Sequence, residues 1–169
     1  MGIRITPERY KSDKHSLMSL SRVAVKSRIG TWTVEGDDEG LTKIYLPHEK
    51  IRSTSQSTRL VSAAARQLDE YFAGKRRNFD IDLHIEGTDF QTRVWTALAN
   101  IPYGTVQTYA EVATSVGHPR AFRAVGSANS GNPFPVVVAC HRVVASTGLG
   151  GYAGGLDVKR FLLELEGAL

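Results

Sequence analysis

The residue pattern of this chain changes at Glu86-Gly87, and that change restricts the possible folds more than any other feature. Before it, short runs of alternating apolar and polar residues predict strands around a single helix. After it, helix-capping motifs and helical spacing predict a series of short helices. We therefore expect an α/β (α+β) protein in three parts: a polar leader over residues 1–20, a small mixed α/β domain over 21–86 and a helical domain over 87–169.

The first domain has predicted strands and a predicted helix but no candidate catalytic residue. The elements we expect are strands over 21–26, 31–35, 41–46 and 81–85 and a helix over 59–72. The helix prediction rests on one apolar stripe, which contains Leu60, Ala64, Leu68 and Phe72. This domain is expected to serve as a scaffold.

The amino-acid composition excludes several classes of protein. The 169 residues contain one cysteine, Cys140, which excludes an intramolecular disulfide framework and a cysteine-rich zinc site. No metal is expected, and a reducing cytoplasm suits such a chain. No apolar run approaches the roughly 18 residues that a membrane helix needs. The net charge of +4 favours anionic partners, but no dense basic block exists, so DNA binding would depend on a few placed arginines.

The second domain begins with two capping boxes, at Thr88 and at Thr108, each with a Glu or Gln three residues later. A third helix is predicted over 119–130. Its expected packing face consists of Ala121, Ala124, Val125 and Ala128, and its polar face of Arg120, Arg123, Ser127 and Ser130. Two short helices around a glycine turn, with arginines near the start of the second, indicate a helix-turn-helix. An ordinary helical hairpin with a solvated polar face fits this pattern about as well.

Cys140 and His141 are the main candidates for chemistry. The apolar run 134–138 predicts a buried strand that ends at Cys140, and a neighbouring imidazole and arginine favour the thiolate. Neighbouring side chains on a strand point in opposite directions, so His141 must reach Cys140 through a water or follow a sharp turn. A carboxylate could orient His141. Glu164 and Glu166 both lie beside the apolar stripe of the last helix, and helical geometry does not choose between them.

Six motifs occur in one order: Gly87-Thr-Asp-Phe-Gln91, Ile101-Pro-Tyr-Gly104, Arg123-Ala-Val-Gly126, Gly131-Asn-Pro133, Cys140-His-Arg-Val143 and Gly151-Tyr152. Together they cover residues 86–167 and resemble the methylated-DNA–protein-cysteine methyltransferases, the alkylguanine-DNA alkyltransferase repair family. Residues 21–86 are similar to that family in the order of their elements only.

The resemblance implies a stoichiometric repair reaction without a cofactor. The alkyl group of 6-O-alkylguanine in double-stranded DNA would pass to Cys140, which His141 deprotonates through a water. Glu166 would orient His141, and Tyr109 would protonate N3 of the guanine. Arg123 would replace the flipped nucleotide, and the DNA-binding face would be completed by Arg120, Ser127 and Ser130.

The resemblance also assigns the residues around the base. Asn132 would be the hinge between the helix-turn-helix and the cysteine. The Val143 carbonyl would accept from the exocyclic amine of guanine, while Tyr152 and Ala153 would line the pocket. The sequence departs from the family at Ala139, where proline usually precedes the cysteine. It also departs at Ala153, which is often serine, so contact with the 6-oxygen would come from the backbone.

Three other functions fit parts of the sequence. One is a non-catalytic protein that binds alkylated bases, although such proteins lack the cysteine. Another is a DNA-binding regulator that uses the helix-turn-helix alone, and a third is a Cys-His-Glu hydrolase. The repair reading predicts a monomer in solution, no membrane partner and a cytoplasmic location, and it leaves clustering on DNA open.

Overall fold

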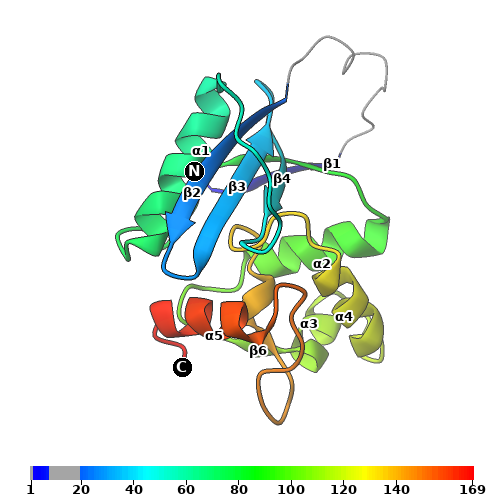
Figure 1. Ribbon diagram of the computed structural model, residues 1–169. Coiled ribbons are helices and arrows are strands. Elements are labelled where there is room, and N and C mark those ends of the chain that lie inside the picture. Colours follow the sequence, from blue (N-terminus) through cyan, green and yellow to red (C-terminus); the bar gives the residue numbers. More distant parts are fainter. Residues whose placement is uncertain (1, 8–19) are drawn as a thin grey trace. The chain divides into compact units, whose positions relative to one another are not determined.

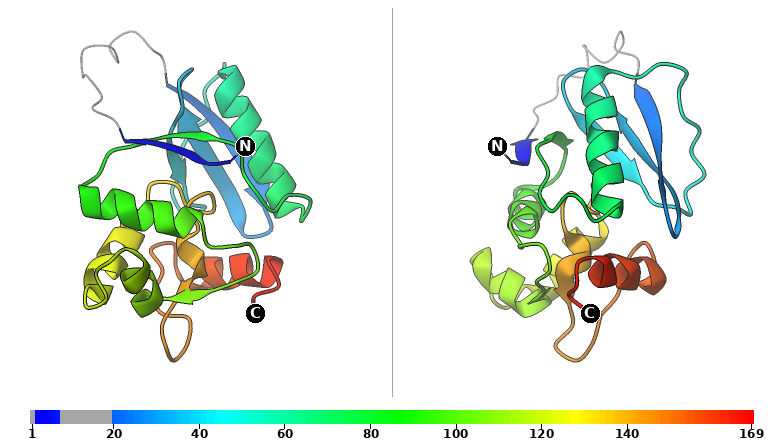
Figure 2. Two further views of the ribbon diagram at one scale, coloured as in Figure 1. Left: turned by 180° about the vertical axis from the view of Figure 1, so that it is seen from behind. Right: turned by 90° about the vertical axis from the view of Figure 1, so that its left-hand side faces the viewer.

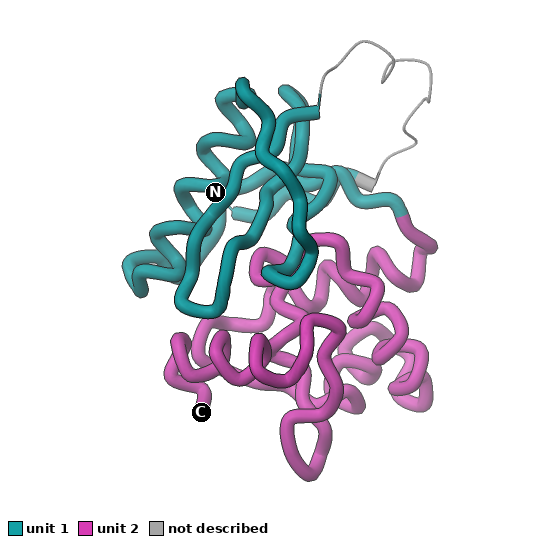
Figure 3. Tube along the Cα trace, in the orientation of Figure 1, with its two compact units in different colours: residues 1–86 teal, residues 87–169 magenta. Residues whose placement is uncertain are grey.

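The computed structural model describes residues 2–7 and 20–169 and divides into two compact units. The first comprises residues 1–86 and the second residues 87–169 (Figure 3). The boundary falls where the pattern of the sequence changes. A mixed sheet with one helix forms the first unit and short helices dominate the second, so the predicted fold class is confirmed. No helix in the described ranges is both long and apolar enough to span a membrane.

The first unit is a five-stranded sheet with the strand order β1-β5-β4-β3-β2. Its strands are β1 (Arg4–Pro7), β2 (Ser21–Ser27), β3 (Gly30–Gly36), β4 (Leu41–Tyr45) and β5 (Asp82–Ile85). Strands β2, β3 and β4 form an antiparallel meander, whereas β5 runs parallel to β1 and β4. The helix α1 (Arg59–Phe72) packs against β2 and β3, along one face of the sheet (Figures 1 and 2).

Strand β1 lies within the polar leader predicted over residues 1–20, so part of that leader is a strand of the first unit. Arg4 aligns with Asp82 in the parallel pair, and its guanidinium forms ion pairs with Asp80 and Asp82. The partner strand lies 78 residues further along the chain. Polar and apolar residues alternate over these four positions, but so short a run does not by itself indicate a strand, because its stability depends on pairing with a distant segment. The rest of the predicted leader, residues 8–19, lies outside the described residues.

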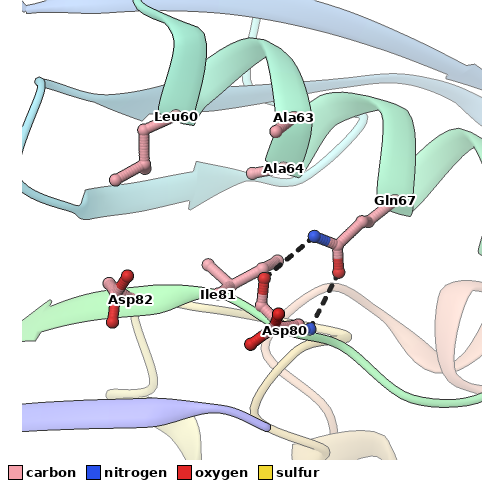
Figure 4. Close-up of a pocket in the computed structure, with 7 residues that line it drawn as sticks. All are labelled: Leu60, Ala63, Ala64, Gln67, Asp80, Ile81 and Asp82. Atoms are coloured by element: carbon pink, nitrogen blue, oxygen red, sulfur yellow. Dashed lines mark hydrogen bonds between the residues drawn. The ribbon is translucent and has the colours of Figure 1, made fainter. Parts of the chain in front are cut away.

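Helix α1 is also attached to the chain segment that enters β5. The Gln67 amide donates to the Asp80 carbonyl at 2.9 Å and accepts from the Asp80 N–H at 2.9 Å, as Figure 4 shows. A small pocket lies beside this pair of hydrogen bonds. Its lining consists of Leu60, Ala63, Ala64, Gln67, Asp80, Ile81 and Asp82.

The second unit is built from short helices. They are α2 (Asp89–Ala99), α3 (Tyr109–Ser115), α4 (Phe122–Ser130), the 3-10 helix η1 (Cys140–Arg142) and α5 (Leu156–Leu165). Strands β6 (Gln107–Thr108) and β7 (Val143–Val144) pair in parallel. Both capping boxes are present, since Thr88 and Thr108 each accept from the N–H of the third helical residue and receive the reciprocal bond.

Helices α3 and α4 form the predicted pair around a turn, with two differences in detail. Helix α4 begins at Phe122 rather than at residue 119, because Pro119 and Arg120 belong to the preceding turn. That turn is closed by the Ala121 N–H, which donates to the His118 carbonyl at 2.8 Å. Ala124 is exposed, so the packing face is narrower than predicted.

The predicted strand over 134–138 is wrong, although the segment is buried. Pro135 cannot donate to a strand ladder, and the Val138 N–H instead donates to the Phe134 carbonyl at 2.8 Å. Val136 has a φ of +75°, which no regular strand contains. The backbone therefore satisfies its hydrogen bonds within a compact turn, and this turn leads into Cys140.

Gly87 and Gly131 give a matched test of packing in the second unit. A Cβ on Gly87 would lie 2.6 Å from the ring of Trp95, which is buried and donates to the Ala128 carbonyl. We expect Gly87→Ala to lower the free energy of unfolding by about 1–3 kcal/mol, because the ring has no room to move. A Cβ on Gly131 would make only ordinary contacts, so Gly131→Ala should change stability by less than about 1 kcal/mol. Urea unfolding of both variants measures the difference, and equal losses would contradict this packing.

Candidate active site

Cys140 is the first residue of η1 and is buried, with 4% of its surface exposed. Its thiol donates to the Tyr152 hydroxyl at 3.6 Å. Burial raises the pKa of Cys140 above its usual value, even though Tyr152, Asn132 and Lys159 act in the opposite direction. The prediction that the surroundings favour the thiolate is therefore wrong. The cysteine is a protonated thiol at neutral pH and needs a base to become a nucleophile.

His141 is fully buried beside it. Its Nε2 lies 2.8 Å from Oε1 of Glu166, which assigns the ring proton to Nε2 because a carboxylate can only accept. Burial lowers the pKa of His141, and Glu166 offsets only part of that effect. The ring is thus neutral. Its Nδ1 is buried without a hydrogen-bond partner among the described residues, so this nitrogen keeps a lone pair that can take a proton.

The Glu166 carboxylate is held from three sides. Nε and Nη2 of Arg142 donate to its two oxygens at 2.9 Å each, His141 contacts Oε1, and the Gly104 N–H donates to Oε2 at 3.2 Å. Burial alone would raise the pKa of Glu166, but the hydrogen bonds and charges of His141 and Arg142 outweigh it and hold the pKa well below its usual range. Glu166 is therefore a permanent anion in the interior.

The segment 101–104 completes the support of this anion. Arg142 donates through Nη1 to the Ile101 carbonyl, and its guanidinium lies 5.8 Å from the centre of the Tyr103 ring. The Tyr103 hydroxyl in turn donates to the Leu165 carbonyl at 3.1 Å. Glu164, by contrast, is exposed. Of the two glutamates that periodicity left open, the structure thus brings Glu166 to His141.

Tyr109, the first residue of α3, lies close to the glycine-rich loop. Its hydroxyl donates to the Gly151 carbonyl at 3.4 Å. A Cβ on Gly150 would lie 3.1 Å from its ring, and one on Gly126 would lie 3.9 Å away. Burial raises the pKa of Tyr109, and the nearby Cys140 adds to this shift. The phenol therefore keeps its proton at neutral pH and is available as a donor.

Asn132 holds the compact turn before Cys140 together. Its Nδ2 donates to the Val138 carbonyl at 2.8 Å, while its Oδ1 accepts from the Phe134 N–H at 2.9 Å. Asn129, on α4, donates to the Cys140 carbonyl at 3.3 Å. The helix-turn-helix is thus connected directly to the cysteine.

Asn129 and Lys159 were not predicted as parts of this site, and Arg142 was predicted only as a positive charge beside Cys140. Lys159 is buried and donates to the Val143 carbonyl at 2.6 Å. The one signal for Lys159 in the sequence is that a cation stands beside the apolar stripe of the last helix. Nothing in the sequence distinguishes Asn129 from a surface residue.

The remaining predicted residues differ in exposure. The predicted DNA-facing residues are all exposed, namely Arg120, Arg123, Ser127 and Ser130. Arg123 lies with its guanidinium 5.9 Å from the centre of the Phe122 ring. Tyr152 is half-buried against the thiol, whereas Ala153 is exposed.

Comparison with known proteins identifies the family. Residues 21–85 match the ribonuclease-like domain of 6-O-methylguanine DNA methyltransferase, and residues 89–168 match its DNA binding domain. The chain belongs to this family. It is therefore a DNA-binding repair protein that transfers an alkyl group to cysteine, and Cys140 is the only cysteine in its sequence.

Relatives match over most of the chain. The methylated-DNA–protein-cysteine methyltransferase of Methanosarcina barkeri is 47% identical over an alignment of 152 residues and covers 84% of this chain and 94% of the relative. The constitutive enzyme of Bacillus subtilis is 40% identical and covers 82% of this chain and 90% of the relative. The crystal structure of the Mycobacterium tuberculosis O6-methylguanine methyltransferase superposes with a TM-score of 0.78 at 42% identity, covering 89% of this chain and 94% of that one.

Glu166 and Glu164 provide a matched pair for the role of the buried anion. We expect Glu166→Gln to slow alkylation of Cys140 by iodoacetamide at pH 7 at least tenfold and to move its pH profile to higher pH, because a protonated His141 loses its negative partner. Glu164→Gln should leave the profile unchanged, since this carboxylate is solvated. A shift in Glu164→Gln without one in Glu166→Gln would refute the assignment.

Ala139 gives a second test, because it has the backbone conformation of a proline. Its φ of −76° and ψ of 57° form an inverse γ-turn, which the Cys140 N–H closes on the Val138 carbonyl at 2.7 Å. Its own N–H donates no hydrogen bond within the described residues. Ala139→Pro should therefore stabilise the protein by about 0.4–1 kcal/mol through the unfolded chain.

The control for this substitution is Ala73→Pro. Its φ of −80° also suits proline, but its N–H donates to the Asp69 carbonyl at 3.0 Å. Loss of that bond and the ring clash should destabilise the protein by about 3 kcal/mol. Thermal unfolding measures both effects, and a lower Tm for Ala139→Pro than for the wild type would contradict the turn geometry.

Proposed function

We propose that this protein repairs 6-O-alkylguanine in double-stranded DNA in a single turnover, with Cys140 as the acceptor of the alkyl group. The observation that carries the proposal is the buried series Cys140, His141 and Glu166. One histidine nitrogen is bound to the carboxylate, and the other has no hydrogen-bond partner within residues 2–7 and 20–169. Support also comes from a structure of the Mycobacterium tuberculosis protein with DNA, which matches with a TM-score of 0.77 at 42% identity.

The transfer begins with the thiol proton. His141 takes it at Nδ1 through a water, and Glu166 stabilises the imidazolium that results. The sulfur of Cys140 then attacks the alkyl carbon, and the bond between that carbon and the 6-oxygen breaks with its electron pair moving into the purine. Tyr109 donates its proton to N3 of the departing guanine and is reprotonated from His141. The net products are S-alkylcysteine and guanine.

The lesion must leave the base stack before this chemistry can occur. Flipping costs a few kcal/mol, and a side chain that fills the vacated space offsets part of that cost. Arg123 takes this position, because it is exposed on α4 near its start. Arg120 contacts the DNA backbone. The small exposed residues Ser127 and Ser130 let α4 approach the minor groove closely.

The flipped guanine is recognised by a backbone carbonyl and by the loop that contains Tyr152 and Ala153. The Val143 carbonyl has a second lone pair beside its bond from Lys159, and that lone pair accepts from the exocyclic amine. Tyr152 and the backbone at Ala153 wall the pocket. Asn132 acts as the hinge that fixes the position of Cys140 relative to α4.

The product explains the single turnover. A thioether has no proton to lose and cannot be restored by His141, so each molecule repairs one lesion. We infer that the protein works in the cytoplasm as a monomer, where reducing conditions keep Cys140 a free thiol.

The direct test uses duplex DNA with a radiolabelled methyl group on the 6-oxygen of guanine. Label should move to protein in a one-to-one ratio and be found on the peptide that contains Cys140. Cys140→Ser should bind the duplex but accept no label, because an alcohol ionises far less readily than a thiol. Continuous turnover would indicate a hydrolase, and binding without transfer in the wild type would indicate a lesion-binding protein or a regulator.

Arg123 should matter only where a base must be flipped. Arg123→Ala is expected to slow repair of duplex DNA at least tenfold while leaving the reaction with free O6-benzylguanine within about twofold, because the free base needs no flipping. Arg66→Ala is the control, since it removes the same charge from an exposed arginine in α1. Equal losses on both substrates would mean that Arg123 is structural.

A further inference from the structure

Phe122 is the first residue of α4 and keeps 47% of its surface exposed. Within the described residues, no other Phe, Tyr or Trp side chain belongs to the exposed class. Contact between a large aromatic ring and water is unfavourable, and covering the ring would release that water. A single exposed apolar side chain is nevertheless common on protein surfaces, so the neighbours of Phe122 decide what its exposure indicates.

The surface around Phe122 is basic and otherwise consists of small residues. The segment 117–130 contains Arg120 and Arg123 but no Asp or Glu. The Arg123 guanidinium lies 5.9 Å from the centre of the Phe122 ring, so the two side chains form one patch. Proteins that bind the minor groove of DNA combine arginine with an apolar wedge that enters between two bases. The charge of this patch complements the phosphate backbone, and the ring adds a surface on which a base can stack.

The ring also lies on the face of α4 that leads to Tyr109. Residues four positions apart are neighbours on one face of a helix, so Phe122 lies one turn from Gly126. A Cβ on Gly126 would lie 3.9 Å from the Tyr109 ring. The Tyr109 hydroxyl in turn donates to the Gly151 carbonyl in the glycine-rich loop. One face of α4 therefore extends from Phe122 to the tyrosine beside the proposed base pocket.

We propose that Phe122 is an apolar wedge for double-stranded DNA, which enters the minor groove beside Arg123 and unstacks the base step next to the flipped nucleotide. This inference rests on the proposed function, because it requires a base to leave the stack. Arg123 fills the space that the flipped base vacates, whereas the Phe122 ring stacks on the neighbouring base that stays in the duplex. Every base has a π-face, so the wedge acts on any sequence around the lesion. Phe122 thus makes flipping less costly without touching the reacting atoms.

The test measures unstacking and repair separately in the full chain. Duplexes contain 6-O-methylguanine and, as the next base on one side or the other, 2-aminopurine, whose fluorescence rises when it unstacks. With transfer blocked by Cys140→Ser, binding should raise the emission at one of the two positions about threefold, and adding Phe122→Ala should remove at least about half of that rise. With Cys140 intact, Phe122→Ala should slow repair of the duplex by about fivefold or more. It should leave the reaction with free O6-benzylguanine within about twofold, because the free base needs no flipping.

Two variants serve as controls. Phe122→Trp keeps an aromatic wedge and should keep both the emission rise and the repair rate. Leu20→Ala removes an exposed apolar side chain from the first unit and should change neither. Because Phe122 is exposed, Phe122→Ala should also unfold in urea at the same midpoint as the wild type.

Three results would overturn the proposal. One is an emission rise as large with Phe122→Ala as without it, and another is equal slowing of the reactions with duplex DNA and with the free base. The third is self-association of the wild type in sedimentation that Phe122→Ala abolishes, because a second copy would then cover the ring. Failure of the wild type to take label from methylated duplex DNA would instead overturn the proposed function, since the fluorescence measurement needs no transfer.

Discussion

The Glu166 carboxylate accepts four hydrogen bonds inside the second unit, two from Arg142 and one each from His141 and the Gly104 N–H. A buried charge of this kind is tolerated only when its hydrogen bonds are satisfied, and removal of one partner leaves another charge uncompensated. The carboxylate therefore joins the end of α5, the helix η1 and the segment 101–104 into one structure. It also fixes which nitrogen of His141 carries the proton, and the remaining chemistry depends on that assignment.

The burial of Cys140 has a functional consequence. A thiol with a raised pKa is unreactive towards the solvent, which protects a protein that can use its cysteine only once. His141, the proposed base, is neutral because burial lowers its pKa. Tyr109, the proposed proton donor, keeps its proton because burial raises its pKa. The same low-dielectric surroundings thus set all three groups in the protonation states that the proposed transfer requires.

Local sequence rules predicted the parts of the fold that have local causes. The capping boxes at Thr88 and Thr108 place α2 and α3, because capping is an interaction between residues three positions apart. Strand β1 could not be predicted, since it forms only through its distant partner β5. The apolar run 134–138 is buried, as predicted, but it is not a strand. The prediction overlooked Pro135, which has no N–H to donate to a neighbouring strand.

The same distinction holds for the site. The family resemblance pointed to Glu166. Periodicity could not distinguish Glu166 from Glu164, because that choice depends on the position of η1 in space. The proposed mechanism depends on the tautomer of His141, which NMR of the ring nitrogens in the full chain measures directly. At pH 7 we expect a neutral ring with the proton on Nε2 and none on Nδ1. A proton on Nδ1, or a doubly protonated ring, would contradict it, because neither state could accept the proton of Cys140 at that atom.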